Sequence, residues 1–466
     1  MKNTLKLGIA LAVLCVGQVA QAQQPEIQYF RYRDARGLNV FETSKKNTVA
    51  YDGMALRIGG NFTQQFQALR HTTASPIDLY KLSPGFNVAT ANLNFDIQLE
   101  DGIRVALENY MSSRHHNEFW VKGGYIQMDK LPMIPGMDWF DKYLTVKIGH
   151  YMPNYGDMHF RRTDNGNALH NPFVGNTLMD AFTTEIGGDL RFESGPFFAV
   201  AGMTGGLISG DVQDKGYFKA ATATDSVQIQ KMPSFLGKIG FDKQFVDDIR
   251  VRLTASAYHN PTTSRNTLYA GDRTGSRYYL VIEPVMTSAT PPVAVTATSN
   301  FTSGRINPGF TTNVTSFMVN PFIKIKGLEL FGMYELSSGY NMAGDAVVTD
   351  GATSFEKRTV NQWMGEAIYR FADDQFYLGG RYNIAQGQFY NGSVYDKAEG
   401  VYELGDQTAT RLELAGGWFM TPSILLKASY VNQDYTGFDQ QTAGALSDIR
   451  SGANFNGAMI EAVIGF

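Results

Sequence analysis

The sequence has one cysteine, few charged residues and, after residue 22, no run of 18 apolar residues. Cys15 lies within the first 22 residues, so a chain cut after Ala22 could form no disulfide, thiol nucleophile or cysteine-bound metal site. Without a long apolar run, the remaining chain cannot cross a membrane as helices. Charged residues make up only 18% of the chain, and the formal net charge is −4, which does not suggest a nucleic-acid partner.

Residues 1–22 have the pattern of a secretory signal peptide. Lys2 and Lys6 precede an apolar run over 7–16, and the small residues of Ala20-Gln21-Ala22 form a cleavage pattern. The apolar run is about half of the roughly 20 residues that a membrane-spanning helix requires. We therefore expect a cleaved signal peptide over 1–22, an N-terminal segment over 23–53 and one domain over 54–466. The segment 31–54 is long and charged enough to be a plug or a periplasmic contact.

Glycine (48), tyrosine (24) and phenylalanine (31) are abundant, which suits strands, turns and large surface aromatics. Residues 92–111, NLNFDIQLEDGIRVALENYM, alternate apolar and polar side chains up to residue 99 and again from residue 103. Two such runs joined by Asp101-Gly102 predict a β-hairpin. The same unit recurs along the chain, with a short turn on one side and a long loop rich in Asn, Asp, Gly, Ser, Thr and Tyr on the other.

Short turns that alternate with long polar loops are typical of a transmembrane antiparallel β-barrel with periplasmic turns and extracellular loops. The pattern predicts sixteen strands, an even number that returns both ends of the barrel to one side. They are expected near 54–69, 86–99, 103–111, 118–129, 143–151, 182–192, 196–204, 233–242, 249–259, 316–325, 328–336, 360–371, 375–385, 409–420, 424–434 and 457–466. Residues 130–142 must then form a long turn. A further hairpin at 277–285 would give eighteen strands.

The terminal strand, GAMIEAVIGF (457–466), favours a membrane barrel over a soluble β-sandwich. Its apolar residues occupy one face and end at Phe466, while Glu461 falls in the opposite register. In a membrane the last strand must pair with the first, because unpaired backbone groups in hydrocarbon are costly. We expect Ile464 to face outer-membrane lipid, Glu461 to face the lumen, and Phe466 to act as a signal for the barrel-assembly machinery.

Two internal stretches extend this interpretation. LTVKIGHYMPNYGDM (144–158) is similar to the strand and proline-glycine segment of the phosphate-selective porin O and P family, and YLGGRYN (377–383) resembles a later strand of that family. The resemblance implies a porin-like barrel. It departs from the family pattern at Asn154-Tyr155-Gly156, and the chain has no dense lysine ladder.

With the apolar register facing lipid, the other register places mixed charges in the lumen. Rings of one sign produce ion selectivity, so this mixture predicts only a weak anion preference. Salt bridges across the lumen are the alternative role of each residue. The basic candidates for lining the pore are Arg57, Arg104, Lys147, Arg161, Arg162, Lys238, Arg250, Arg252, Arg381, Arg411 and Lys427.

Arg161 and Arg162 belong to the third long loop, 151–180, which also carries His159 and His170. In general porins the third loop narrows the channel. We hypothesise that Arg161 and Arg162 form a cationic constriction, because guanidiniums suit phosphate or carboxylate solutes. Their replacement by Ala should then reduce anion preference. The alternative is an exposed loop without solute contact.

The expected function is passive diffusion of small hydrophilic or anionic solutes through an outer-membrane porin. The alternative is a non-conducting barrel that docks a secretion or surface-protein complex. An enzyme is not expected, since a nucleophile-elbow motif is missing and His115, His116, His159 and His170 lack zinc-site spacing. The sequence indicates no catalytic residue, cofactor or metal site. A homotrimer is one expected assembly, which the sequence does not distinguish from a monomer.

Overall fold

The structure is a computed structural model that describes residues 24–46, 49–112, 118–163, 167–206, 216–220, 223–263, 265–270, 277–287, 291–296, 300, 302–342, 345–389, 406–439 and 448–466. The signal peptide predicted over 1–22 lies outside these residues, as do His115 and His116. Among the described residues, no helix is long and apolar enough to cross a membrane.

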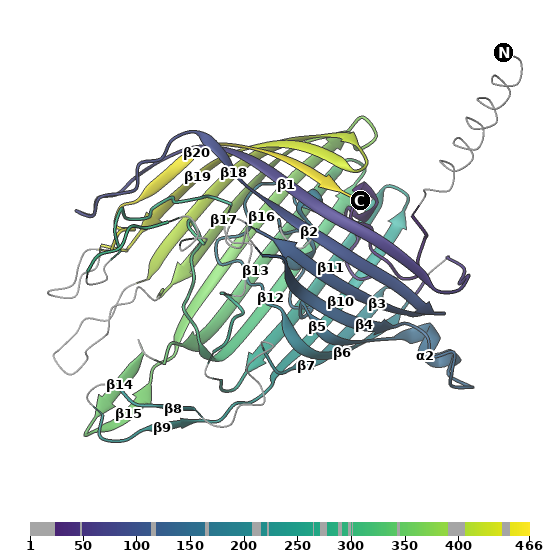
Figure 1. The fold of residues 1–466 in the computed structure, drawn as a ribbon, viewed down its shortest axis with the longest axis horizontal. Helices are drawn as coiled ribbons and strands as arrows, with labels where there is room; N and C mark the ends of the chain where they lie inside the picture. The colour runs from purple at the N-terminus through teal and green to yellow at the C-terminus, as the bar shows by residue number, and fades with distance from the viewer. Residues whose placement is uncertain are drawn as a thin grey trace, which may run out of the picture.

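Sixteen strands form one closed barrel in which each strand pairs antiparallel with the next, and the last pairs with the first (Figure 1). They are β1 (Ala55–Thr72), β2 (Gly85–Glu100), β3 (Ile103–Met111), β4 (Trp120–Met128), β5 (Leu144–Tyr151), β6 (Glu185–Ser194), β7 (Phe197–Thr204), β10 (Ser234–Val246), β11 (Ile249–Asn260), β12 (Thr312–Ile325), β13 (Leu328–Tyr340), β16 (Arg358–Phe371), β17 (Phe376–Gly387), β18 (Gln407–Thr421), β19 (Ile424–Thr436) and β20 (Asn454–Gly465). The prediction of an all-β, sixteen-stranded antiparallel barrel is confirmed.

The eighteen-strand alternative is wrong. Residues 277–285 contribute only an isolated bridge, between Leu79 and Pro284, to the described β-structure. Two small hairpins that alternation did not predict lie outside the barrel sheet: β8 (Gly216–Phe218) with β9 (Val227–Ile229), and β14 (Ala346–Thr349) with β15 (Ala352–Phe355). Figure 1 shows both hairpins at one end of the barrel and α2 (Asp138–Tyr143) at the other. This helix occupies part of the predicted long turn over 130–142.

The short turns can be tight because their residues tolerate positive φ. Gly102 between β2 and β3 has φ 75°, and a Cβ at this position would lie 2.4 Å from the Cβ of Lys130. Glycine avoids both the conformational strain and the contact. The Asp-Gly turn read from the sequence therefore joins β2 and β3 as expected.

The predicted register of the terminal strand is confirmed. Ile464 is 45% exposed on the outside of the barrel, whereas Glu461 is fully buried inside, 2.8 Å from the Lys427 ammonium. Phe466 lies on the outside and stacks on Phe62 of β1, with ring centroids 6.2 Å apart. Around the barrel the same alternation places large apolar side chains outside and most charged side chains inside.

Candidate functional site

Three segments fold into the interior of the barrel, which we call the lumen. They are the N-terminal segment 24–46, the third loop 152–184 between β5 and β6, and the loop 261–311 between β11 and β12. Short 3-10 turns shape the first two: η1 (Ala35–Gly37), η3 (Met158–Phe160) and η4 (Ala168–His170). Most of the described residues of the third loop are buried, and the other two segments have buried parts, such as 27–29 and 277–279, and exposed ones, such as 24–26 and 291–294. The lumen is therefore largely filled by protein.

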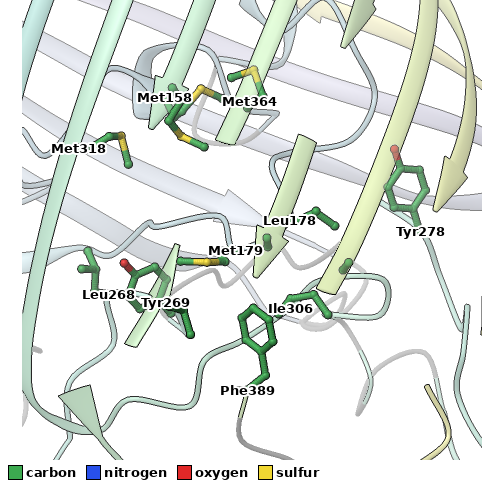
Figure 2. Close-up of a cluster of buried hydrophobic side chains, with 14 of the residues drawn as sticks. Met158, Leu178, Met179, Leu268, Tyr269, Tyr278, Ile306, Met318, Met364 and Phe389 are labelled. Atoms are coloured by element: carbon green, nitrogen blue, oxygen red, sulfur yellow. The ribbon is translucent and has the colours of Figure 1, made fainter. Parts of the chain in front are cut away.

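Part of this filling is an apolar core. Figure 2 shows Leu178 and Met179 of the third loop and Ile306 of the β11–β12 loop in one cluster with inward side chains of the barrel strands. The barrel contributes apolar residues at inward positions, including Met318 of β12 and Met364 of β16. Burying such surface stabilises by roughly 25 cal/mol per Å². The loops are therefore held inside by packing as well as by polar contacts.

The N-terminal segment is tied to the barrel by a buried charge cluster. The Glu42 carboxylate lies 2.9 Å from the Lys238 ammonium and 2.7 Å from the Arg252 guanidinium. Asp157 of the third loop contacts the same two cations, at 2.7 and 2.9 Å. Burial opposes ionisation of Glu42, but Arg252 and Lys238 outweigh it and hold the pKa of this carboxyl well below its ordinary value.

Hydrogen bonds from uncharged groups of the segment add to this attachment. Gln28 accepts a hydrogen bond from Gly102 N–H at 2.7 Å, and its own N–H donates to Gln98 at 2.8 Å. The Ala35 N–H donates to the carbonyl of Pro422 in the β18–β19 turn, at 2.8 Å. Asn39 donates to Glu329 of β13. Since these partners lie on several sides of the barrel, the segment crosses the lumen.

The two arginines of the third loop bind protein carboxylates. Arg161 lies 3.0 Å from Glu366 of β16, and Arg162 donates two hydrogen bonds to Asp180 of its own loop, at 3.1 and 2.6 Å. Both guanidiniums are buried. The hypothesis that they contact solutes stays a prediction, and in this structure their geometry serves to hold the third loop in place.

The histidines of the third loop are buried beside cations. Burial, reinforced by Lys238, lowers the pKa of His159 to about 3. Burial and Arg31 likewise hold the pKa of His170 well below its ordinary value, and one ring nitrogen of His170 lies 3.0 Å from the carbonyl oxygen of Asp34. Both imidazoles are therefore neutral at pH 7. Within the described residues, no three His, Asp or Glu side chains are grouped so that they could hold a metal ion.

The other candidate pore-lining arginines and lysines point inward and have protein partners. Arg381 bridges Glu366 and Glu413 at 2.6 and 3.2 Å, and Lys427 pairs with Glu461. The remaining contacts are Arg57 to the Pro25 carbonyl, Arg104 to Asp96, Arg250 to Asp242, and Arg411 to Gln433 and to the carbonyls of Asn176 and Gly304. Buried charges need such partners because isolated ions are strongly destabilised away from water.

Two pockets of about 480 and 640 Å³ lie beside Leu38 and Asn39, and a smaller polar cavity of about 150 Å³ lies beside the third loop. It lies between the N-terminal segment, the third loop and strands β2 to β7. Arg33 reaches into it toward Asp96 and Glu108, at 3.8 and 3.5 Å. Its charged lining consists of Arg31, Arg33, Arg104, Lys147 and Arg191, against Glu42, Asp96, Glu108 and Asp189. Cations thus exceed carboxylates by one, which creates a mixed field with a slight positive excess.

Lys147 differs from the buried lumen cations. It is half-buried, and its ammonium lies over the rings of Tyr125 and Tyr151, 4.9 and 5.5 Å from their centroids. Asp189 stands directly opposite on β6, as its register partner. These two residues face the cavity across a pair of adjacent strands.

Sequence reasoning did not identify Glu42, Asn39 or Asp157 as organising residues. The length and charge of the segment 31–54 suggested a plug, but a single sequence carries no signal for which of its residues meets which strand. Asp157 follows the Pro-Asn-Tyr-Gly stretch, where only the fold brings it to Lys238 and Arg252.

Comparisons with known proteins give likenesses of fold only. No family model and no curated protein matches the chain. Among solved structures, an anion-selective porin from Comamonas acidovorans matches with 9% identity over 89% of this chain and 100% of its own, at a TM-score of 0.47. The outer membrane channel DcaP of Acinetobacter baumannii matches with 11% identity over 90% and 99%, at 0.47.

OmpT, an outer membrane protein of Vibrio cholerae, matches with 12% identity over 90% of this chain and 99% of its own, at a TM-score of 0.46. Similarities at this level assign neither a family nor a solute to this chain. The resemblance to the phosphate-selective porin O and P family therefore stays a prediction.

Proposed function

We propose that this protein is an outer-membrane channel that passes small hydrophilic solutes through the narrow polar cavity beside its N-terminal segment. The observation that carries the proposal is a closed barrel with an apolar outer face and a cavity lined by charged side chains. A closed barrel leaves no unpaired strand edge in lipid, and an apolar exterior suits hydrocarbon. Outer-membrane lipid and the barrel-assembly machinery are the partners that follow from this proposal.

The filled lumen restricts what such a channel could pass. The cavity volume of about 150 Å³ is smaller than the roughly 300–1,000 Å³ of sites for drug-sized ligands. Small ions and solutes are therefore the expected cargo. The slight excess of cations in the lining supports a weak preference for anions.

A non-conducting barrel that serves as a docking partner is the second candidate, and the same filling favours it. Three segments occupy the lumen, and the N-terminal segment crosses it through buried polar contacts on several sides. If these segments never move and the cavity has no continuous path, the barrel has a structural role.

Planar-bilayer recording separates the two functions. We expect the purified protein to give small, stable conductance steps in KCl, with a reversal potential in a salt gradient that indicates weak anion preference. In a variant whose residues 24–46 are replaced by a Gly-Ser linker of equal length, the steps should increase. Bilayers that stay silent with both proteins would contradict the channel and favour the docking role.

The anion preference has its own readout in these recordings. A reversal potential on the cation-selective side would contradict the preference but leave the channel intact. In a matched variant, a linker of equal length replaces the β14–β15 hairpin, residues 346–355, which lies outside the barrel sheet. This variant should keep the wild-type step size.

A further inference from the structure

Lys147 and Asp189 present opposite charges to the same cavity without forming a direct ion pair. They are register partners on β5 and β6, and both are half-buried. Within the part of the chain that the structure describes, Lys147 makes two cation–π contacts, with Tyr125 and Tyr151, and no salt bridge. Asp189 is stabilised by the charge of Lys147 and accepts a hydrogen bond from the Tyr151 hydroxyl.

Most other lumen charges contrast with this pair. Lys238 and Arg252 share Glu42 and Asp157 at 2.7 to 2.9 Å, and Arg381 is held between two carboxylates. Those cations and carboxylates satisfy one another, so a solute would have to break a protein contact to reach them. Within the described residues, neither Lys147 nor Asp189 is held in such a salt bridge.

We propose that the cavity binds a small zwitterion, a free amino acid by chemical class, with its carboxylate on Lys147 and its ammonium on Asp189. The inference rests on the proposed channel function and specifies its solute. The aromatic rings beside Lys147 limit the space around the ammonium and keep it facing the cavity. A zwitterion offers each of the two residues an ionic partner.

The opposite charges of this pair are the physical reason to prefer a zwitterion over an anion. An anion on Lys147 would meet the like charge of Asp189, whereas a solute with two charged ends pairs with both residues. An analogue that lacks one end would leave Lys147 or Asp189 without its partner. The site should therefore discriminate against both single-charge analogues.

The test compares three labelled solutes of similar size in proteoliposomes at pH 7, with uptake into empty liposomes subtracted. Alanine carries both charges, propionate lacks the ammonium and ethylamine lacks the carboxylate. For the wild-type protein we expect alanine to enter about fivefold faster than either analogue, the ratio that one half-exposed ionic contact can supply.

Two variants test which residue binds the carboxylate and which binds the ammonium of the zwitterion. Asp189→Asn should bring alanine uptake down to the rate of propionate, and Lys147→Gln should bring it down to the rate of ethylamine. The matched controls Lys324→Gln and Asp373→Asn change charge on β12 and in the β16–β17 turn, outside the lining of this cavity, and should keep the wild-type ratio. Lys324→Gln removes a positive charge, as Lys147→Gln does, and Asp373→Asn removes a negative charge, as Asp189→Asn does.

KCl conductance steps of each protein distinguish this inference from the channel proposal. Steps together with equal uptake of the three solutes, faster uptake of propionate than of alanine, or an unchanged ratio in both test variants would overturn the zwitterion site and leave the channel standing. Absence of both conductance and uptake would overturn the channel itself.

Discussion

Glu42 joins the N-terminal segment to the barrel through two cations, and its replacement is the sharpest test of that attachment. Glu42→Gln leaves Lys238 with the Asp157 carboxylate, and Arg252 with those of Asp157 and Asp242. Removing one partner of a buried ionic cluster costs on the order of 3 kcal/mol. We expect the segment to leave the lumen more often, so trypsin should cleave at Arg31, Arg33 or Arg36 in the folded barrel and conductance steps should grow.

Glu26→Gln is the matched control, because Glu26 is exposed on the same segment. Equal trypsin cleavage of the two variants would show that the Glu42 cluster does not hold the segment.

Since the pKa of Glu42 is held below its ordinary value, the stabilisation that Glu42 contributes is present above pH about 4.5 and is lost as pH falls through the lowered pKa. Wild-type protein should thus resist cleavage throughout the neutral range.

At the residue scale, the alternation of apolar and polar residues predicts which side chains point into the barrel but not which residues they contact there. It placed Lys238, Arg252 and Arg381 inside the barrel, where the structure has them. It could not predict that Glu42 from the N-terminal segment and Asp157 from a loop would meet the first two, because a hydrogen bond or ion pair between distant segments leaves no local pattern. The alternative of salt bridges across the lumen describes these contacts in the structure.

At the scale of elements, the β11–β12 loop carries a titratable contact. Burial raises the pKa of Glu283 to about 7, although the Ser303 hydroxyl donates to it at 2.8 Å and Arg450 is near. Because this pKa is raised, docking of the β11–β12 loop is strongest below pH about 4.5, where Glu283 is protonated in both the docked and the undocked loop. Docking weakens as pH rises through 7. We expect hydrogen exchange of residues 277–287 to be faster, relative to its intrinsic rate, at pH 8 than at pH 5.

Glu283→Gln should flatten this difference, whereas Asp78→Asn, on an exposed residue of the adjacent loop, should leave it in place. His71 accepts the Ile282 N–H at 2.9 Å, so any pH dependence that survives in Glu283→Gln is assigned to that imidazole. An unchanged difference in a Glu283→Gln, His71→Gln double variant would show that neither group controls the loop.

The elements divide into those that sequence predicts and those that it does not. All sixteen barrel strands follow from period-two alternation and short turns, because each strand has one apolar face toward the outside. The segments inside the lumen lack such a period. Residues such as Leu178, Ile306 and Phe310 pack there in an irregular backbone, and the sequence around them is typical of any polar loop. The cavity depends on how the N-terminal segment and the third loop fit against the strands, so it was beyond prediction.

At the scale of the whole molecule, the outward register decides whether the barrel can enter a membrane. Ile460 and Ile464 lie on the same outer face of β20, with Ile460 near the middle of the strand and Ile464 near its end. A lysine on the lipid face costs about 2–4 kcal/mol at the bilayer midplane and about 0–1 kcal/mol near the interface. Ile460→Lys should therefore reduce the folded fraction strongly and Ile464→Lys only slightly.

The folded fraction can be read from the heat-dependent migration of the protein on a gel after folding into lipid vesicles. Asp247→Lys, in the exposed β10–β11 turn, is the matched control and should fold like the wild type. The folded fraction should decrease from Asp247→Lys to Ile464→Lys to Ile460→Lys, as the lysine lies deeper in the bilayer. This order tests both the direction of the side chains and the position of the hydrocarbon along β20. If all three variants fold equally well, the apolar outer face does not meet lipid, and the membrane location on which the channel proposal depends is wrong.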